Sequence, residues 1–176
     1  MKLNIVKHPA DILQQKTEEL TKEEINSEEI QTLIDNMIET MHAAEGVGLA
    51  GPQVNKPKRM TIIGSHAFEG QGVNLPVEES GDLPLINPYW SKLDKKETKQ
   101  KEGCLSIPNT YGTVKRWKNI EVEALDRDGN KLKFQAQDYL ARVIQHEVDH
   151  LEGTLFIEKA TNIEEVDPIK QAVKNR

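Results

Sequence analysis

A chain of 176 residues is long enough for one domain with a hydrophobic core and short for two, so we expect a single catalytic domain over residues 1–176. Its hydrophobic content of 36% and charged content of 30% indicate a soluble globular protein, and its net charge of −6 argues against direct nucleic-acid binding. No apolar run approaches ~18 residues, and residues 1–9 lack the apolar core of a signal peptide, so we expect no membrane span and a cytoplasmic location. The single cysteine, Cys104, excludes an internal disulfide and suits a reducing compartment.

Apolar periodicity predicts a long helix in the first quarter of the chain. Over residues 28–43 apolar side chains recur at i, i+3, i+4, i+7 and i+8, and Ser27 is a candidate N-cap. The segment Gly46–Gln53 follows with three glycines and one proline, which disfavour a regular helix and allow another group to approach the backbone closely. The alternative interpretation of this segment is an ordinary turn.

The middle of the chain is predicted to form short strands and loops. Residues 60–64 and 85–88 are interpreted as strands. Residues 65–84 are rich in Gly, Pro, Glu and Ser, which indicates an exposed loop. The charge run over residues 92–101 is interpreted as a solvated hairpin or edge strand rather than a binding patch.

Alternating apolar residues predict a hairpin in the second half of the chain. Residues 112–125 and 132–136 alternate as strands, and Asp126–Asn130 between them contains an Asp-Gly pair that is typical of a hairpin turn. A further strand is predicted over residues 155–157, and one or two helical turns are expected after Pro168.

An H-E-x-x-H pattern lies on a helix predicted to run from Asp138, its candidate N-cap, to a stop at Gly153. Because residues i and i+4 share one helix face, His146 and His150 can reach one metal ion, with Glu147 within a turn of a bound water. The alternative is a pair of core histidines, but so many ionisable groups in one segment are costly to bury without a ligand. The buried stripe of this helix is predicted to consist of Leu140, Val143, Ile144 and Leu151.

Cys104 completes a candidate metal-binding set. It follows Gly103, which allows a backbone turn to present its sulfur. Together with His146 and His150 it gives three protein ligands and leaves a fourth position for water, as in catalytic rather than structural sites. Ligand type alone suggests zinc, although thiolate and imidazole suit several divalent ions. The alternative interpretation of Cys104 is a small buried apolar residue.

Three segments together resemble the motifs of peptide deformylase. That family carries G-φ-G-φ-A-A-x-Q, E-G-C-L-S and Q-H-E-x-D-H segments in this order, and the chain has Gly46–Gln53, Glu102–Ser106 and Gln145–His150. The similarity extends over about residues 5–157. One position departs from the pattern: Gly51 stands where the family usually has a second Ala, which is expected to increase backbone freedom beside Gln53 and to loosen the substrate strand.

The resemblance implies a metal-dependent hydrolase that removes the N-formyl group from the N-terminal methionine of newly made polypeptides and releases formate. It implies one Fe²⁺ per chain, with Zn²⁺, Ni²⁺ or Co²⁺ as substitutes in purified protein. N-formylmethionyl nascent peptides would be the partners. Some family members dock on the ribosome through a long basic C-terminal helix, and the short tail after Ile157 gives at most part of one.

The resemblance also implies roles for individual residues. Glu147 is expected to act as the general base that takes a proton from water and delivers it to the leaving amine. The side-chain amide of Gln53 and the backbone N–H of Leu105 are expected to stabilise the oxyanion. Gly48 is expected to hydrogen-bond the substrate backbone.

A pocket for the methionine side chain is expected beside these groups. Val47, Tyr139 and Val143 are the candidates for its wall. Glu102 and Asp149 are candidates for orienting the metal-bound histidines, because such histidines usually donate their other N–H to a carboxylate or carbonyl. A surface position for Arg116 is as plausible as a pairing with one of these carboxylates.

Two other functions compete with the deformylase hypothesis. An H-E-x-x-H endopeptidase would usually have His or Glu, not Cys, as its third ligand. A non-catalytic metal-binding or ribosome-associated module would not need the intact Glu147 and Gln53. In each case the expected fold is α+β, with antiparallel strands and hairpins wrapped around the 138–152 helix and the 28–43 helix packed outside.

Overall fold

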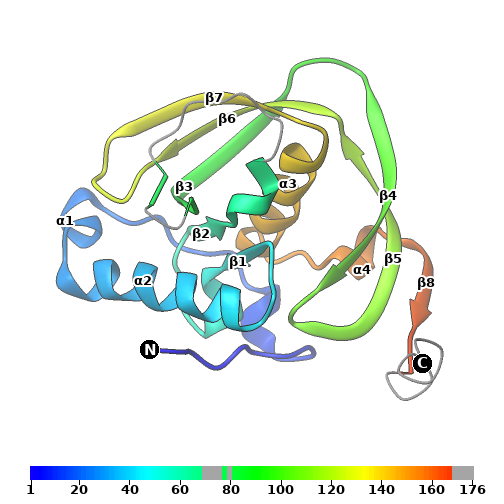
Figure 1. Cartoon of the computed structure of the whole chain (residues 1–176), viewed down its shortest axis with the longest axis horizontal. Helices are drawn as coiled ribbons and strands as arrows, with labels where there is room; N and C mark the ends of the chain where they lie inside the picture. Colours follow the sequence, from blue (N-terminus) through cyan, green and yellow to red (C-terminus); the bar gives the residue numbers. More distant parts are fainter. Residues whose placement is uncertain (69–76, 79–80, 168–176) are drawn as a thin grey trace.

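The computed structural model describes residues 1–68, 77–78 and 81–167, and shows an α+β fold (Figure 1). Its helices are α1 (Lys22–Ile25), α2 (Glu28–Ala43), α3 (Asp138–Leu151) and α4 (Phe156–Lys159), with short 3₁₀ turns η1 (Asp11–Gln14), η2 (Gly51–Val54) and η3 (Ser65–Phe68). Its strands are β1 (Gly48–Ala50), β2 (Met60–Ile63), β3 (Leu83–Lys92), β4 (Glu97–Cys104), β5 (Ile107–Trp117), β6 (Asn119–Leu125), β7 (Lys131–Gln137) and β8 (Thr161–Glu165). The predicted fold, antiparallel strands around a central helix, is confirmed.

The described strands form two antiparallel sheets. The order is β1-β2-β3-β6-β7 in the larger sheet and β4-β5-β8 in the smaller one. The predicted hairpin joins β6 to β7, and Asp126 Oδ1 accepts hydrogen bonds from the backbone N–H groups of Asp128 (2.9 Å) and Asn130 (2.8 Å). Gly129 adopts a φ of +79°, a conformation that favours glycine. The turn residues therefore fix the register of this hairpin.

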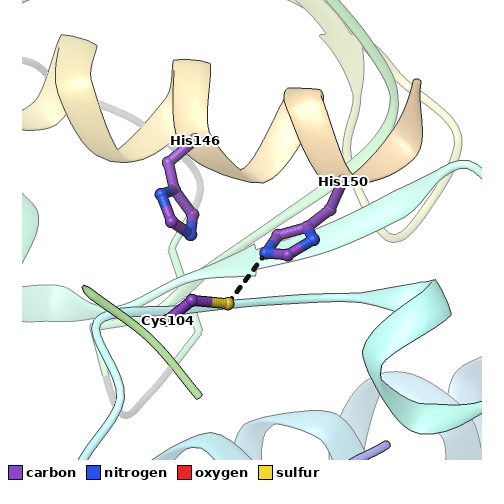
Figure 2. A group of neighbouring side chains, drawn as sticks. All are labelled: Cys104, His146 and His150. Carbon is purple, nitrogen blue, oxygen red and sulfur yellow. Dashed lines mark hydrogen bonds between the residues drawn. The ribbon is translucent and has the colours of Figure 1, made fainter. Parts of the chain in front are cut away.

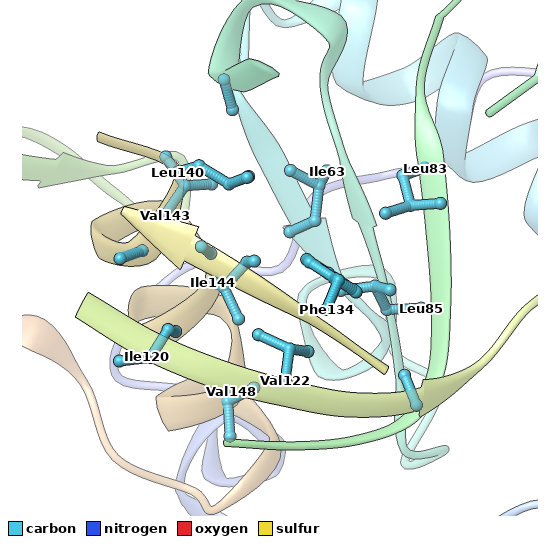
Figure 3. Close-up of a cluster of buried hydrophobic side chains, with 14 residues drawn as sticks. Ile63, Leu83, Leu85, Ile120, Val122, Phe134, Leu140, Val143, Ile144 and Val148 are labelled. Atoms are coloured by element: carbon cyan, nitrogen blue, oxygen red, sulfur yellow. The ribbon is translucent and has the colours of Figure 1, made fainter. Parts of the chain in front are cut away.

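Helix α3 packs against the larger sheet and lies inside the molecule (Figures 1 and 3). The predicted stripe residues Leu140, Val143, Ile144 and Leu151 are all buried, which confirms the helical periodicity. Side chains of this stripe contact apolar residues of β2, β3, β6 and β7. Burying one such aliphatic side chain contributes about 1.5–3 kcal/mol, so the helix is held in a fixed position.

Helix α2 covers the other face of the β1–β3 part of the sheet. Ser27 Oγ accepts a hydrogen bond from the N–H of Ile30 at 3.3 Å, which confirms Ser27 as the N-cap. Ile62 belongs to the core cluster beneath α2, whereas Ile63, next in the strand, belongs to the cluster beneath α3. Neighbouring strand residues point to opposite faces, so β2 is buried on both sides and the two helices sandwich it.

Several predicted boundaries differ from the structure. Gln137, not Asp138, is the N-cap of α3. Asp138 is the first residue of the helix, and its φ is +49°. The strand predicted over residues 155–157 is wrong, because Leu155 is the N-cap of α4 and its N–H donates to Glu158 Oε1 at 2.7 Å. Short apolar runs fit a buried helical turn as well as a strand, so the sequence pattern did not distinguish them.

The remaining predictions of local structure have mixed outcomes. Residues 97–101 do form an exposed edge strand, the outer part of β4. The exposed loop predicted over residues 65–84 instead contains η3 and the start of β3, with residues 69–76 and 79–80 outside the described part. Strand β8 was not predicted, because each of its residues is exposed and shows no alternation. The helical turns predicted after Pro168 lie outside the described residues.

Across residues 1–68, 77–78 and 81–167, no helix combines the length and the apolar character that crossing a membrane requires.

Candidate metal centre

Cys104, His146 and His150 converge although they are far apart in the chain. Cys104 lies at the end of β4, whereas both histidines project from α3 toward it (Figure 2). One ligand atom from each residue lies within 4.8 Å of the others, and Cys104 Sγ is 3.2 Å from His150 Nε2. The two ring centroids are 5.1 Å apart, as expected for residues one turn apart on one helix face.

Local backbone geometry presents the sulfur to the helix. The register of β4 and β5 shifts between Gly103 and Cys104, so Cys104 lies opposite Ile107 across a tight turn. A Cβ atom on Gly103 would lie 2.9 Å from the ring of Tyr111, so the ring can pack here only because residue 103 is glycine. The glycine predicted to allow this presentation therefore also seats the neighbouring aromatic ring.

Glu102 orients the first histidine from within the protein. Its side chain is buried, and Glu102 Oε2 is 3.0 Å from His146 Nδ1. Arg116 donates to both carboxylate oxygens, at 3.0 and 2.9 Å, and Arg142 donates to Oε1 at 2.6 Å. Burial would raise the pKa of Glu102, but the hydrogen bonds from His146 and Arg116 outweigh it and hold the pKa far below its ordinary value. The group is therefore a carboxylate.

The same arginine links the site to α4. Arg116 also donates to Asp149, and Lys159 Nζ lies 2.6 Å from the other carboxylate oxygen of Asp149. Glu102, Arg116 and Asp149 are all buried. The structure therefore favours the pairing of Arg116 over its surface interpretation, and joins both carboxylates to it.

The donor set fits a transition-metal ion. Burial would raise the pKa of the Cys104 thiol, but the charge of His150 and a hydrogen bond with His146 lower it well below its ordinary value, which favours a thiolate. For His146, burial alone would lower the pKa, but hydrogen bonds with Cys104 and Glu102 raise it to about 10. The surroundings of His146 therefore favour a positive charge. A bound metal ion would supply that charge in place of the proton on the imidazole.

A cavity of about 520 Å³ opens beside the three residues. Cys104, His146 and Glu147 line it, although His150 does not. The other residues predicted for the site all line the same cavity: Gln53, Leu105, Gly48, Val47, Tyr139 and Val143. The structure thus brings together, in one cavity wall, every residue for which the sequence predicted a direct part in substrate binding or catalysis.

Comparisons with known proteins identify the family. The model of the family described as polypeptide deformylase matches residues 2–166. The chain belongs to this family. The peptide deformylase of Symbiobacterium thermophilum is 46% identical over 165 residues, which cover 93% of the chain and 69% of that relative. The peptide deformylase of Syntrophomonas wolfei is 46% identical over 164 residues, which cover 92% of the chain and 97% of that relative.

A solved structure supports the same assignment. The crystal structure of class I type b peptide deformylase from Acinetobacter baumannii, bound to Met-Ala-Ser, superimposes with a TM-score of 0.79 at 33% identity, covering 90% of this chain and 98% of that one. The enzyme is accordingly a deformylase that removes the N-formyl group from newly made polypeptides. This identity favours the deformylase hypothesis over the endopeptidase and the non-catalytic module.

The acid between the two histidines is buried in this deformylase. Glu147 is 4% exposed, and its Oε2 atom has no hydrogen-bond partner within the described part of the chain. Burial raises the pKa of Glu147 above its ordinary value, although the two histidines act to lower it. A Cβ atom on Gly48 would lie 2.4 Å from Glu147 Oε1. The bare backbone of Gly48 therefore forms the seat of the Glu147 carboxylate.

Gln53 is held in one orientation by residues that sequence reasoning missed. Its Oε1 accepts a hydrogen bond from the N–H of Ala50 at 2.8 Å, and its Nε2 donates to Ser106 Oγ at 3.2 Å and to Cys104 Sγ at 3.5 Å. Ser106 is fully buried. Its place in the E-G-C-L-S segment was the signal that marked it, but nothing in the sequence predicted its contact with Gln53.

Gly51 does not loosen the segment beside Gln53. It is buried, and a Cβ atom on it would lie 2.6 Å from the carbonyl oxygen of Lys58 and 2.8 Å from that of Lys56. The Lys56 N–H donates to the Gly51 carbonyl at 3.0 Å. The expectation of greater backbone freedom beside Gln53 is wrong, because the absent methyl group makes room for the neighbouring turn to pack closely.

Replacing Arg116 tests whether the buried charge network stabilises the site. Arg116→Met keeps the apolar stem but leaves the Glu102 and Asp149 carboxylates without the guanidinium. We expect the free energy of unfolding in urea, at matched metal content, to fall by about 3–5 kcal/mol. Lys133→Met is the control, because Lys133 pairs with Glu121 and Glu123 on the protein surface. Equal losses for the two variants would show that the network is not needed.

Proposed function

We propose that Cys104, His146 and His150 hold one Fe²⁺, at which the enzyme hydrolyses the formamide of N-formylmethionyl peptides and releases formate. The observation that carries this proposal is the convergence of one thiolate and two imidazoles beside the cavity, with Cys104 and His146 in its wall. The choice of iron follows the family resemblance, and the same donors would accept Zn²⁺, Ni²⁺ or Co²⁺. When bound, the ion would act as a Lewis acid that makes a water molecule more acidic.

Glu147 is the general base in this proposal. Its carboxylate takes a proton from the attacking water as the oxygen adds to the formyl carbon. It then delivers that proton to the departing nitrogen as the C–N bond breaks, so the products are formate and a peptide with a free amine. The burial that raises the pKa of Glu147 makes it a stronger base than an exposed carboxylate.

Two donors would stabilise the oxyanion. The Gln53 amide is fixed with its N–H side toward Cys104 by Ala50 and Ser106, as described above. The backbone N–H of Leu105 is proposed as the second donor. Donors that are positioned before the reaction lose no reorganisation energy when the charge develops, and each typically accounts for about 2.7–4 kcal/mol of barrier lowering.

The peptide would bind between the edges of the two sheets. Gly48 lies in β1 at one edge of the larger sheet, and β4 forms an edge of the smaller sheet, and both line the cavity. An extended chain placed there would bond through its backbone, with Gly48 as one partner. Val47, Tyr139 and Val143 would contact the methionine side chain. The relative crystallised with Met-Ala-Ser is consistent with a bound peptide of this type.

We place this reaction in the cytoplasm, in a single catalytic domain, with N-formylmethionyl nascent peptides as partners. Direct nucleic-acid binding and membrane association are not part of the proposal. Docking on the ribosome through a basic C-terminal helix is not part of the proposal either, because residues 161–165 form strand β8 rather than a helix.

The role of Glu147 is tested by Glu147→Ala in protein with unchanged metal content. We expect kcat for formate release from a formyl-Met peptide to fall by about 10²–10⁴-fold, because proton transfer loses its carrier. Glu45→Ala, at an exposed glutamate of the cavity rim, is the control and should retain activity. Full activity of Glu147→Ala would contradict the proposed base. Absence of formate release with Fe²⁺, Ni²⁺ and Co²⁺ alike would contradict the whole proposal.

Gly48→Ala separates two roles of that glycine. The added methyl group would strike the Glu147 carboxylate, whereas the backbone atoms that bond the substrate remain. We therefore expect kcat to fall at least about tenfold, a loss of 1.4 kcal/mol of transition-state stabilisation, with a smaller change in KM. Gly46→Ala is the comparison, because its methyl group would meet the end of the flexible Leu105 side chain. A change confined to KM would show that Gly48 acts on substrate binding alone.

A further inference from the structure

The first eight residues connect helix α2 with the candidate metal centre. The N-terminal amine lies 2.5 Å from Asn36 Oδ1 and 2.6 Å from Glu39 Oε2, and the Leu3 N–H donates to Thr40 Oγ1 at 2.8 Å. From there the segment passes below α2 toward the turn between β4 and β5 (Figure 1). Ile5 and Lys7 line the cavity wall. The segment is therefore anchored at one end to α2 and reaches the reaction site at the other.

Three consecutive residues, Val6, Lys7 and His8, contact the segments that carry both proposed oxyanion donors. We call Val6–His8 the N-terminal strap. The Val6 N–H donates to the Gln53 carbonyl at 2.8 Å, and the His8 N–H donates to the Ser106 carbonyl at 2.9 Å. The Lys7 ammonium donates to the Leu105 carbonyl at 2.5 Å.

The two donors come from different parts of the fold. Gln53 lies in η2, directly after β1 of the larger sheet, whereas Leu105 follows β4 of the smaller sheet. Their separation therefore depends on contacts that cross between the sheets. The strap supplies such contacts to both sides, and the bond from Gln53 Nε2 to Ser106 Oγ supplies another.

We propose that Lys7 is a positioning residue for deformylation, acting through the turn that carries the Leu105 N–H. This inference rests on the proposed oxyanion role of Gln53 and Leu105. A charged donor forms a stronger hydrogen bond than a neutral one, so the ammonium restrains the Leu105 carbonyl more firmly than water would. With the Ser106 carbonyl held by His8, the turn has little freedom to rotate its N–H away from the oxyanion position. Misplacing a reacting or stabilising group lowers kcat, because it weakens stabilisation of the transition state, and leaves the affinity for substrate largely unchanged.

The test compares Lys7→Met, Lys7→Arg and Lys2→Met in the metal-loaded enzyme. Lys7→Met removes the ammonium and keeps an unbranched apolar stem, and Lys2 is an exposed lysine of the same segment that does not line the cavity. We expect Lys7→Met to lower kcat about three- to tenfold with KM within about twofold, since the donor is misplaced rather than removed. Lys7→Arg should restore kcat to within about twofold, because it keeps a charged donor. Lys2→Met should match the parent enzyme.

Two readouts separate positioning from other roles. Formyl-Met peptides with Asp or Lys at the third position should lose kcat equally in Lys7→Met. A rise in KM for the Asp peptide alone would show that Lys7 binds substrate charge, and would overturn the proposal. In the zinc-loaded protein, hydrogen exchange of the Ser106 and Leu105 amides should speed up in Lys7→Met. Unchanged kcat and unchanged exchange would also overturn it, whatever the melting temperature.

Gln53→Ala distinguishes this inference from the proposed function. If Gln53→Ala leaves kcat unchanged, the oxyanion assignment of Gln53 is wrong, and the positioning role of Lys7 that rests on it is wrong as well. If Gln53→Ala lowers kcat strongly while Lys7→Met does not, the oxyanion assignment stands and only the positioning role of Lys7 is wrong.

Discussion

The buried carboxylate of Glu102 is the contact on which the site depends. It stands two residues before Cys104 on β4, so the strand that delivers the thiol also delivers the group that orients His146. Arg142 of α3 and Arg116 of β5 donate to the same carboxylate. The edge of the smaller sheet and the central helix are therefore joined at one point, and the candidate metal-binding atoms of Cys104 and His146 lie beside it.

Burying this network of charges costs free energy, so its contribution is to the geometry of the site rather than to stability. Desolvating several charges is repaid only when every one is paired with good geometry, so buried ion pairs are weak sources of stability. Here Arg116 bridges Glu102 and Asp149, and Lys159 contacts Asp149 from α4. The arrangement fixes the direction of two histidine-bearing turns of α3 relative to β4. Its main contribution is a defined geometry at the site, consistent with the orienting role that such carboxylates have around metal-bound histidines.

Glycines set the spacing around this centre. The carboxylate of Glu147 occupies the position of a side chain on Gly48, the Tyr111 ring occupies that of Gly103, and two carbonyl oxygens occupy that of Gly51. In each case the missing Cβ lets a functional or structural group approach the backbone. The close packing at Gly51 stiffens the short turn that carries Gln53, and the N-terminal strap holds the same turn from the other side. Gln53, a proposed oxyanion donor, is thus fixed by packing as much as by hydrogen bonds.

The sequence predicted those features that have a local signal. Helix periodicity placed α2 and α3, and the Asp-Gly pair placed the β6–β7 turn. The three motifs marked six residues that share one cavity: Gly48, Gln53, Cys104, Leu105, His146 and Glu147. Strand β8 has no alternation because it is exposed throughout, and α4 is too short to show a helical period. The contact of Lys7 with Leu105 links positions 98 residues apart and that of Arg142 with Glu102 positions 40 residues apart, so no local pattern reports them.

The central claim, that a single ion is held by Cys104, His146 and His150, is tested most directly by X-ray absorption spectroscopy of the zinc-loaded protein. We expect one sulfur neighbour at about 2.3 Å and nitrogen neighbours at about 2.0–2.1 Å, with the sulfur contribution lost in Cys104→Ser. A spectrum without sulfur in the coordination shell, or one that Cys104→Ser leaves unchanged, would contradict it.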